Sequence, residues 1–185
     1  MPAVSSTLPL IPFAPPSDGV VRSLEASVEK HASGRLLIRF TLEADMSRLR
    51  VPQRRPSHQT NELWKHTCFE AFIAPVGSGY CELNFAPSTE WAAYGFDDYR
   101  KGITPLGVVA PDLRVEMTPT RLQLDVRVDG AAVLAAAKLD ASPGKWRVAL
   151  TAVLEDEHGT LSYWALKHAQ AKPDFHHPAG FILEV

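Results

Sequence analysis

Two short segments near the middle of the chain combine carboxylate, amide and aromatic side chains at strand-like spacing. They are residues 63–75 (LWKHTCFEAFIAP) and 80–100 (YCELNFAPSTEWAAYGFDDYR). Within them, Glu70, Glu82 and Asn84 stand where a plain sandwich strand needs only generic polar residues. Planar polar groups beside aromatic rings suit a surface that binds a polar ligand with a flat apolar face. Binding is therefore the first hypothesis for this chain, and catalysis is the second.

These residues need a β-hairpin to bring them together. Side chains on a strand point alternately to opposite faces. The favoured register places apolar residues opposite one another at three positions: Phe69 with Phe85, Ala71 with Leu83, and Ile73 with Cys81. The other face then has Glu70 opposite Asn84 and Phe72 opposite Glu82, with a hairpin loop at 75–79. We therefore expect Phe69, Leu83 and Phe85 to be buried between two sheets.

The same register separates the two cysteines of the chain. Cys68 points to the polar face and Cys81 to the core, so their Cβ atoms cannot approach to the roughly 4 Å that a disulfide requires. Two unpaired thiols indicate a reducing compartment. Small, buried packing residues are the simplest interpretation of both cysteines.

The candidate ligand-binding residues divide into two groups. Aromatic side chains could stack on a sugar ring: Trp64, Trp91, Tyr94 and Tyr99. Polar side chains could bind its hydroxyl groups: Glu70, Glu82, Asn84 and Arg100. The alternatives are that any single Trp packs in the core, and that Glu70 and Asn84 form only a cross-strand hydrogen-bonded pair. We expect Glu70, Asn84, Trp91 and Arg100 to line one concave surface.

A second polar cluster lies near the end of the chain, at residues 172–177 (KPDFHH), with His168 just upstream. We expect Lys172, Asp174 and His176 to contact the ligand from the edge of the surface. Two imidazoles and a carboxylate could instead bind zinc or iron. However, the adjacent residues His176 and His177 point opposite ways on an extended chain, and no H-x-x-x-H or C-x-x-C spacing occurs. No metal site is therefore predicted.

Catalytic and cofactor motifs are otherwise missing. The chain has no G-x-S-x-G, P-loop or dinucleotide-binding pattern. Glu70 and Glu82 could in principle carry out glycoside hydrolysis as a carboxylate pair. A haem alternative would need axial His or Met ligands, and Met46, Met117 and seven histidines are available without a marked spacing. The sequence predicts neither a catalytic residue nor a required cofactor.

The length, the net charge and the N-terminal residues further restrict the class of protein that this chain can be. A chain of 185 residues with a net charge of −2 is expected to form about one domain without general attraction to nucleic acid. The arginine-rich stretch 48–65 contains two prolines and is interpreted as an exposed loop, with an anion or RNA contact as the alternative. Residues 1–19 contain five prolines, no basic start and no unbroken apolar run, so neither a signal peptide nor a membrane span is expected. They are interpreted as an extended lead-in to a domain spanning 20–185, and a cytoplasmic location is expected.

Alternating strands occupy most of the remaining sequence. The expected strands cover residues 20–29, 36–42, 68–74, 80–85, 90–97, 113–117, 122–128, 146–155, 161–166 and 181–185. Residues 102–112 are expected to form a loop, and Ala-rich residues 131–138 the one short helix. Without crossover helices, a parallel sheet is disfavoured. The predicted fold is an all-β antiparallel sandwich of jelly-roll or immunoglobulin-like type.

Three motifs in this order resemble the bacterial DOMON-like proteins, which are related to family 9 carbohydrate-binding modules. They are LWKHTCFEAFIAP, YCELNFAPSTEWAAYGFDDYR and LSYWALKHAQAKPDFHHPAGF (residues 161–181), and the resemblance covers about residues 20–185. It implies a ligand-binding β-sandwich without chemistry of its own, with sugar as the ligand in some members and haem in others. The resulting expectation is a non-catalytic module for a sugar or sugar-like polar metabolite. The sequence identifies no protein partner.

Overall fold

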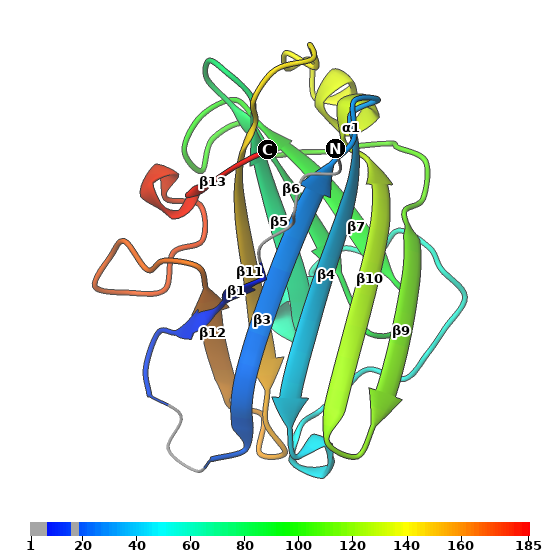
Figure 1. The fold of residues 1–185 in the computed structure, drawn as a ribbon, viewed down its shortest axis with the longest axis vertical. Helices are drawn as coiled ribbons and strands as arrows, with labels where there is room; N and C mark the ends of the chain where they lie inside the picture. Colours follow the sequence, from blue (N-terminus) through cyan, green and yellow to red (C-terminus); the bar gives the residue numbers. More distant parts are fainter. Residues whose placement is uncertain (1–6, 16–18) are drawn as a thin grey trace.

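The structure is a computed structural model that describes residues 7–15 and 19–185. Two antiparallel sheets pack face to face, with β3, β4, β10 and β9 in the front layer of Figure 1 and the strands of the second sheet behind them. The first sheet has the order β1 (Leu8–Pro9), β3 (Val21–Lys30), β4 (Arg35–Ala44), β10 (Arg121–Asp129) and β9 (Asp112–Thr118). This arrangement confirms the predicted all-β antiparallel sandwich.

The second sheet carries the two segments that opened the sequence analysis. Its order is β2 (Ile11–Pro12), β12 (Leu161–Ala165), β11 (Arg147–Glu155), β5 (Cys68–Ala74), β6 (Tyr80–Phe85), β7 (Trp91–Phe96) and β8 (Thr104–Pro105), and β13 (Leu183–Glu184) pairs with β11. Three short 3-10 turns occur in the described residues: η1 (Met46–Arg48), η2 (Leu63–Lys65) and η3 (Pro178–Gly180). None of the helices in the described part of the chain is long and apolar enough to cross a membrane.

The core between the sheets follows the predicted alternation. Leu36, Ile38, Phe40 and Leu42 are buried on β4, and every second residue from Leu122 to Val128 is buried on β10. The second sheet contributes Phe69, Leu83 and Phe85, as predicted. The rings of Phe40 and Phe69 lie 5.1 Å apart and join the two layers. Period-2 alternation thus places one apolar face of each sheet in the core.

Most element boundaries agree with the predicted ones, with small differences at the ends. The helix α1 spans Gly130–Ala136, and the Asp129 side chain caps it by accepting a hydrogen bond from the Ala132 N–H at 3.0 Å. The expected loop 102–112 includes β8, which pairs with the edge of β7. The expected strand 181–185 is shorter, because η3 precedes β13.

The N-terminal segment touches both sheets. Leu8–Pro9 pairs with β3, and Ile11–Pro12 pairs with β12 in the other layer. Leu10, between them, is only 3% exposed and belongs to the core. Residues 1–6 and 16–18 of the expected lead-in lie outside the described residues.

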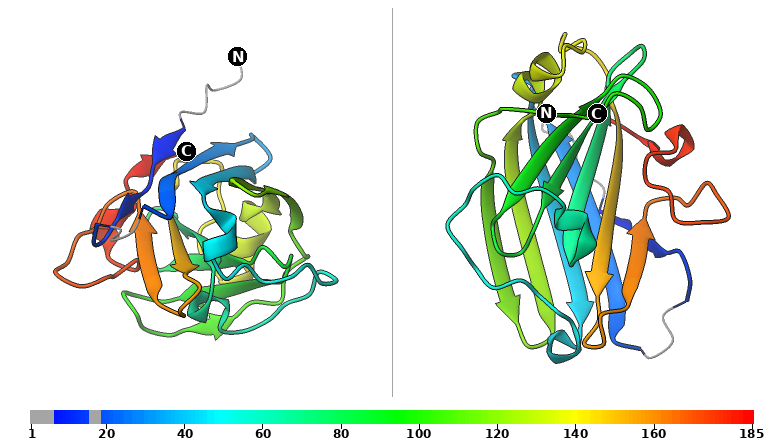
Figure 2. Two further views of the ribbon diagram at one scale, coloured as in Figure 1. Left: turned by 90° about the horizontal axis from the view of Figure 1, so that it is seen from below. Right: turned by 180° about the vertical axis from the view of Figure 1, so that it is seen from behind.

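The outer face of the second sheet is also buried. Every residue of β5, β6 and β7 is buried, although only one face of these strands meets the first sheet. The turn η2 lies against this outer face (Figure 2). A second apolar cluster, which includes Phe72, Tyr94, Phe96 and Phe181, packs here against Trp64 and Phe175. The surface expected to be concave is therefore a partly enclosed cavity.

Candidate functional site

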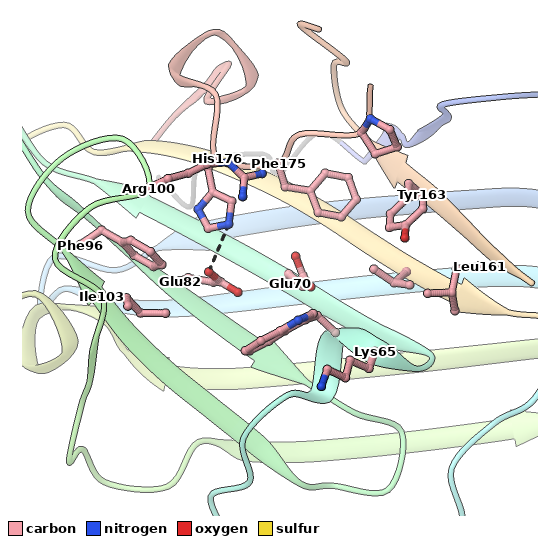
Figure 3. A pocket seen from close by; sticks show the side chains of 13 residues that line it. Lys65, Glu70, Glu82, Phe96, Arg100, Ile103, Leu161, Tyr163, Phe175 and His176 are labelled. Carbon is pink, nitrogen blue, oxygen red and sulfur yellow. Dashed lines mark ion pairs between the residues drawn. The ribbon is translucent and has the colours of Figure 1, made fainter. Parts of the chain in front are cut away.

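A cavity of about 510 Å³ lies on the outer face of the second sheet (Figure 3). Its floor comes from β5, β6 and β11, and its walls from η2, the end of β7 and the loop after it, β12 and the segment that follows β12. The lining residues are Trp64, Lys65, Glu70, Glu82, Phe96, Arg100, Ile103, Val153, Leu161, Tyr163, Pro173, Phe175 and His176. The volume falls within the range typical of small-molecule sites, roughly 300–1,000 Å³.

The hairpin register brings the two acidic residues of the cavity together. Glu70 pairs with Asn84 and Phe72 pairs with Glu82, as predicted. Glu70 and Glu82 are therefore diagonal neighbours on one face, a relation that corresponds to Cα atoms roughly 7–8 Å apart. Glu70 is 2% exposed and Glu82 is 5% exposed.

Each carboxyl group has one neutral hydrogen-bond donor. Thr151 Oγ1 donates to Glu70 Oε2 at 3.1 Å, and Asn84 Nδ2 donates to Glu82 Oε1 at 2.8 Å. Within residues 7–15 and 19–185, the Glu70 carboxyl has no other hydrogen bond. Behind this pair, Cys68 Sγ donates to Asn84 Oδ1 at 3.5 Å. The floor of the cavity is thus acidic, and the protein uses only part of the hydrogen-bonding capacity of its carboxyl oxygens.

Burial changes the protonation of both acids. Burial, followed by the nearby charge of Glu82, raises the pKa of Glu70 well above its ordinary value. Burial also raises the pKa of Glu82 to about 7, against the opposing effects of the Asn84 hydrogen bond and the Arg100 charge. Two neighbouring carboxyls in a desolvated site resist joint ionisation. The pair therefore retains protons at pH values where an exposed glutamate is fully charged.

His176 forms the wall next to Glu82. Its Nδ1 lies 2.8 Å from the Tyr80 hydroxyl, and its Nε2 lies 3.7 Å from Glu82 Oε2, the contact marked in Figure 3. Burial, followed by the positive charge of Arg100, lowers the pKa of His176 to about 4. The distance to Glu82 would suit an ion pair, but the shifted pKa values favour the neutral form of both groups in the interval between about pH 4 and pH 7. The imidazole is thus held neutral in the wall.

Arg100 and Asp174 form a charged cluster at the edge of the cavity. Arg100 Nη2 donates to Asp174 Oδ1 at 2.8 Å, and the Tyr99 hydroxyl donates to Asp174 Oδ2. Asp174 also accepts from the His176 N–H at 3.2 Å. Although burial alone would raise the pKa of Asp174, the Tyr99 and Arg100 hydrogen bonds lower it. This cluster anchors the segment 172–177 against the loop after β7.

Aromatic rings make up much of the remaining wall. Trp64 contacts Tyr94 edge to face, with ring centroids 5.7 Å apart. Tyr163 and Phe175 form a second edge-to-face contact at 6.0 Å. The Phe96 ring stacks on Tyr80 at 4.7 Å. Apolar walls around a polar floor are typical of sites for small amphipathic molecules.

The structure brings together five of the predicted site residues. Trp64, Glu70, Glu82, Arg100 and His176 line the cavity. Three others support the lining residues through hydrogen bonds or ring contacts: Asn84, Tyr94 and Asp174. Lys172 is exposed and does not line the cavity.

The expected position of Trp91 is wrong. Trp91 pairs with Phe85, is 4% exposed and belongs to the core between the sheets. Trp91 and Tyr94 are three residues apart on one strand, so they must face opposite sides of the sheet. Tyr94 pairs with Glu82 and faces the site.

Several lining residues were absent from the sequence-based set: Lys65, Phe96, Ile103, Val153, Leu161, Tyr163, Pro173 and Phe175. Phe96 could have been found, because it lies two residues from Tyr94 and so shares its face. Leu161 and Tyr163 alternate on β12, but no local signal indicates that this strand adjoins the cavity.

The cysteine prediction is confirmed, since Cys68 and Cys81 are both free and buried. Cys68 contacts Asn84 on the site face, whereas Cys81 contacts the backbone of α1. No group of three or more His, Cys, Asp or Glu side chains suited to a metal ion occurs among the described residues.

Comparison with known proteins supports the fold. No family model matches this chain, and no curated protein matches it significantly, so the resemblance to DOMON-like proteins remains a prediction. Among solved structures, the chain is similar to a "putative carbohydrate-binding protein" from Bacteroides uniformis, with a TM-score of 0.67 and 13% sequence identity. The similarity covers 95% of this chain and 84% of that chain. The chain is thus an antiparallel β-sandwich that carries a ligand-sized cavity on the outer face of one sheet.

Proposed function

We propose that the protein is a non-catalytic module that binds a small carbohydrate in this cavity. The observation that carries the proposal is a floor of two buried carboxyl groups, Glu70 and Glu82, enclosed by aromatic walls. A sugar has hydroxyl groups for the floor and C–H faces for the rings. The solved structure of similar fold bears a carbohydrate-binding description, which also supports this ligand class.

The proposal is tested by titrating the purified protein with monosaccharides and disaccharides, using calorimetry and thermal unfolding. A sugar present at a hundredfold excess over its dissociation constant raises the free energy of unfolding by about 2.7 kcal/mol. Trp64→Ala and Glu70→Gln are each expected to weaken binding about tenfold, equivalent to about 1.4 kcal/mol. Glu25→Gln is the matched control, because Glu25 is exposed on the other sheet.

Two results would contradict the proposal. One is the failure of every sugar to bind or to stabilise the protein. The other is a sugar that binds Trp64→Ala, Glu70→Gln and the parent protein with the same affinity, because such a ligand would occupy another surface.

A glycoside hydrolase is a second candidate, favoured by the raised pKa values of two neighbouring carboxyls. Such pairs serve as acid and base, or as acid and nucleophile, in glycosidases. Incubation with chromogenic aryl glycosides distinguishes the candidates. Release of the aryl alcohol that is abolished in both Glu70→Gln and Glu82→Gln would establish catalysis and replace the binding proposal.

We do not propose the haem alternative. His176 is the imidazole that lines the cavity, and its two ring nitrogens face Tyr80 and Glu82. An axial ligand needs a ring nitrogen directed at iron. The described lining residues therefore fit haem poorly.

A further inference from the structure

The cavity floor carries an excess of acid over base. Its cationic neighbours are already engaged: Arg100 pairs with Asp174 at 2.8 Å, and Lys65 pairs with Glu62 at 2.8 Å in an exposed position. His176 is held neutral by burial and by the nearby charge of Arg100. No Lys or Arg of the described residues forms an ion pair with Glu70 or Glu82. A ligand that enters the cavity therefore meets two carboxyls without a cationic partner.

The geometry leaves room for hydrogen bonds to such a ligand. Glu70 is 2% exposed, yet only its Oε2 has a hydrogen bond within the described parts of the chain. Its carboxyl is directed into the cavity beside that of Glu82 (Figure 3). An ammonium group has three donors and can reach two neighbouring carboxylates at once. A charge-assisted pair of this kind is stronger than a bond from a neutral hydroxyl.

The walls favour the same chemistry. Trp64, Phe96 and Phe175 contribute aromatic rings around the acidic floor. Aromatic faces attract cations through the ring quadrupole, and the attraction increases where water is excluded. Acidic groups surrounded by aromatic rings are suited to a positively charged ligand.

We propose that the cavity holds a protonated amine between Glu70 and Glu82, and that its ligands are amino sugars. This inference rests on the proposed carbohydrate function, because an amino sugar combines an ammonium group with a carbohydrate ring. The ammonium group supplies the missing counter-charge and allows both carboxyls to ionise inside the cavity.

The first experiment compares glucosamine, N-acetylglucosamine and glucose by calorimetry at pH 6.5. Glucosamine is expected to bind at least tenfold more tightly than the other two, because acetylation removes the charge and glucose lacks the amine. In Glu70→Gln and Glu82→Gln this ratio should fall toward one, whereas Glu25→Gln should retain it. Equal affinities for glucose and glucosamine, or a ratio unchanged in both pocket variants, would overturn the inference and leave the carbohydrate proposal standing.

The second experiment separates the amine from the sugar. Cyclohexylamine should bind to the cavity in competition with glucosamine, and cyclohexanol should not. If no sugar binds but cyclohexylamine does, the amine subsite is supported and the carbohydrate proposal fails. If cyclohexylamine and cyclohexanol behave alike, the amine subsite is overturned.

Proton release gives an independent readout. Binding of glucosamine should release protons from the carboxyl pair, detected as a difference in binding heat between two buffers of unequal ionisation enthalpy. The titratable or charged groups that face the pair are Cys68 on β5, Tyr80 on β6, Tyr94 on β7, Tyr163 on β12, Lys65, Arg100 and His176. Asp174 contacts Arg100 and the His176 N–H. Glucose should release fewer protons, and Glu82→Gln should reduce the release. Equal release with glucose and glucosamine would contradict the inference.

Discussion

Glu82 and His176 lie side by side, and burial shifts their pKa values in opposite directions. The pKa of Glu82 is raised to about 7, so the protonated acid is favoured by the folded state. The pKa of His176 is lowered to about 4, so the neutral imidazole is favoured. The stability that Glu82 provides is fully present below pH 4.5 and is lost as the pH rises through 7. The stability that His176 provides is present above pH 6.5 and is lost as the pH falls through 4.

We predict that Glu82→Gln removes the loss of folding stability that accompanies a rise in pH through 7. The variant should gain stability relative to the parent protein between pH 5 and pH 8, by on the order of 2 kcal/mol, because glutamine does not ionise. Urea unfolding at several pH values measures the difference. Glu25→Gln provides the control for a lost surface charge. A difference between Glu82→Gln and the parent that stays constant with pH would show that Glu82 does not titrate in this range.

At the scale of elements, tight turns determine which side chains of the strands point to the core and which point to the site. The Ala86 N–H donates to the Glu90 carbonyl at 2.9 Å, and Thr89 adopts a φ of 74°. This turn places Trp91 opposite Phe85 and therefore in the core. A similar constraint acts at the β3–β4 turn, where Gly34 has a φ of 80°. A Cβ atom at Gly34 would lie 2.6 Å from Ala131 Cβ on α1.

Gly34→Ala is accordingly predicted to destabilise the protein by about 2 kcal/mol. The left-handed backbone disfavours an L side chain, and the new methyl group collides with α1. Gly107→Ala is the matched control, because a Cβ there meets no atom within 4 Å and its backbone is not left-handed. Chemical unfolding of both variants tests the prediction. It is contradicted if the two variants unfold at the same denaturant concentration.

At the scale of the whole molecule, residues 8–12 connect the two sheets by pairing with a strand of each. The segment pairs with β3 in one sheet and with β12 in the other, and Leu10 is buried between these contacts. The segment is therefore part of the sandwich.

Leu10→Ala is predicted to lower the free energy of unfolding by about 2–5 kcal/mol, the usual range for a buried leucine. Val76→Ala, in the exposed β5–β6 loop, should change it by less than about 0.5 kcal/mol. Thermal unfolding compares the two. Little effect of Leu10→Ala would show that the segment is not packed as described.

The sequence alone determined the two-sheet sandwich, the β5–β6 register and the opposite placement of Cys68 and Cys81. The register and the cysteine placement depend on period-2 alternation within one hairpin, and the fold class follows from the recurrence of such alternating strands along the chain. The same alternation would have assigned Trp91 to the core and Phe96 to the site, had it been applied along β7. These features are local, so they can be predicted from the residues concerned.

Only the tertiary structure decided that the acidic face is a cavity and not an open surface. The covering parts are η2, which directly precedes β5, the loop after β7, and the segment 172–177, which lies far from the hairpin in sequence. Their positions depend on long-range contacts such as Arg100 with Asp174 and Tyr80 with His176. Burial by these covering segments removes water from Glu70 and Glu82, and this desolvation raises their pKa values.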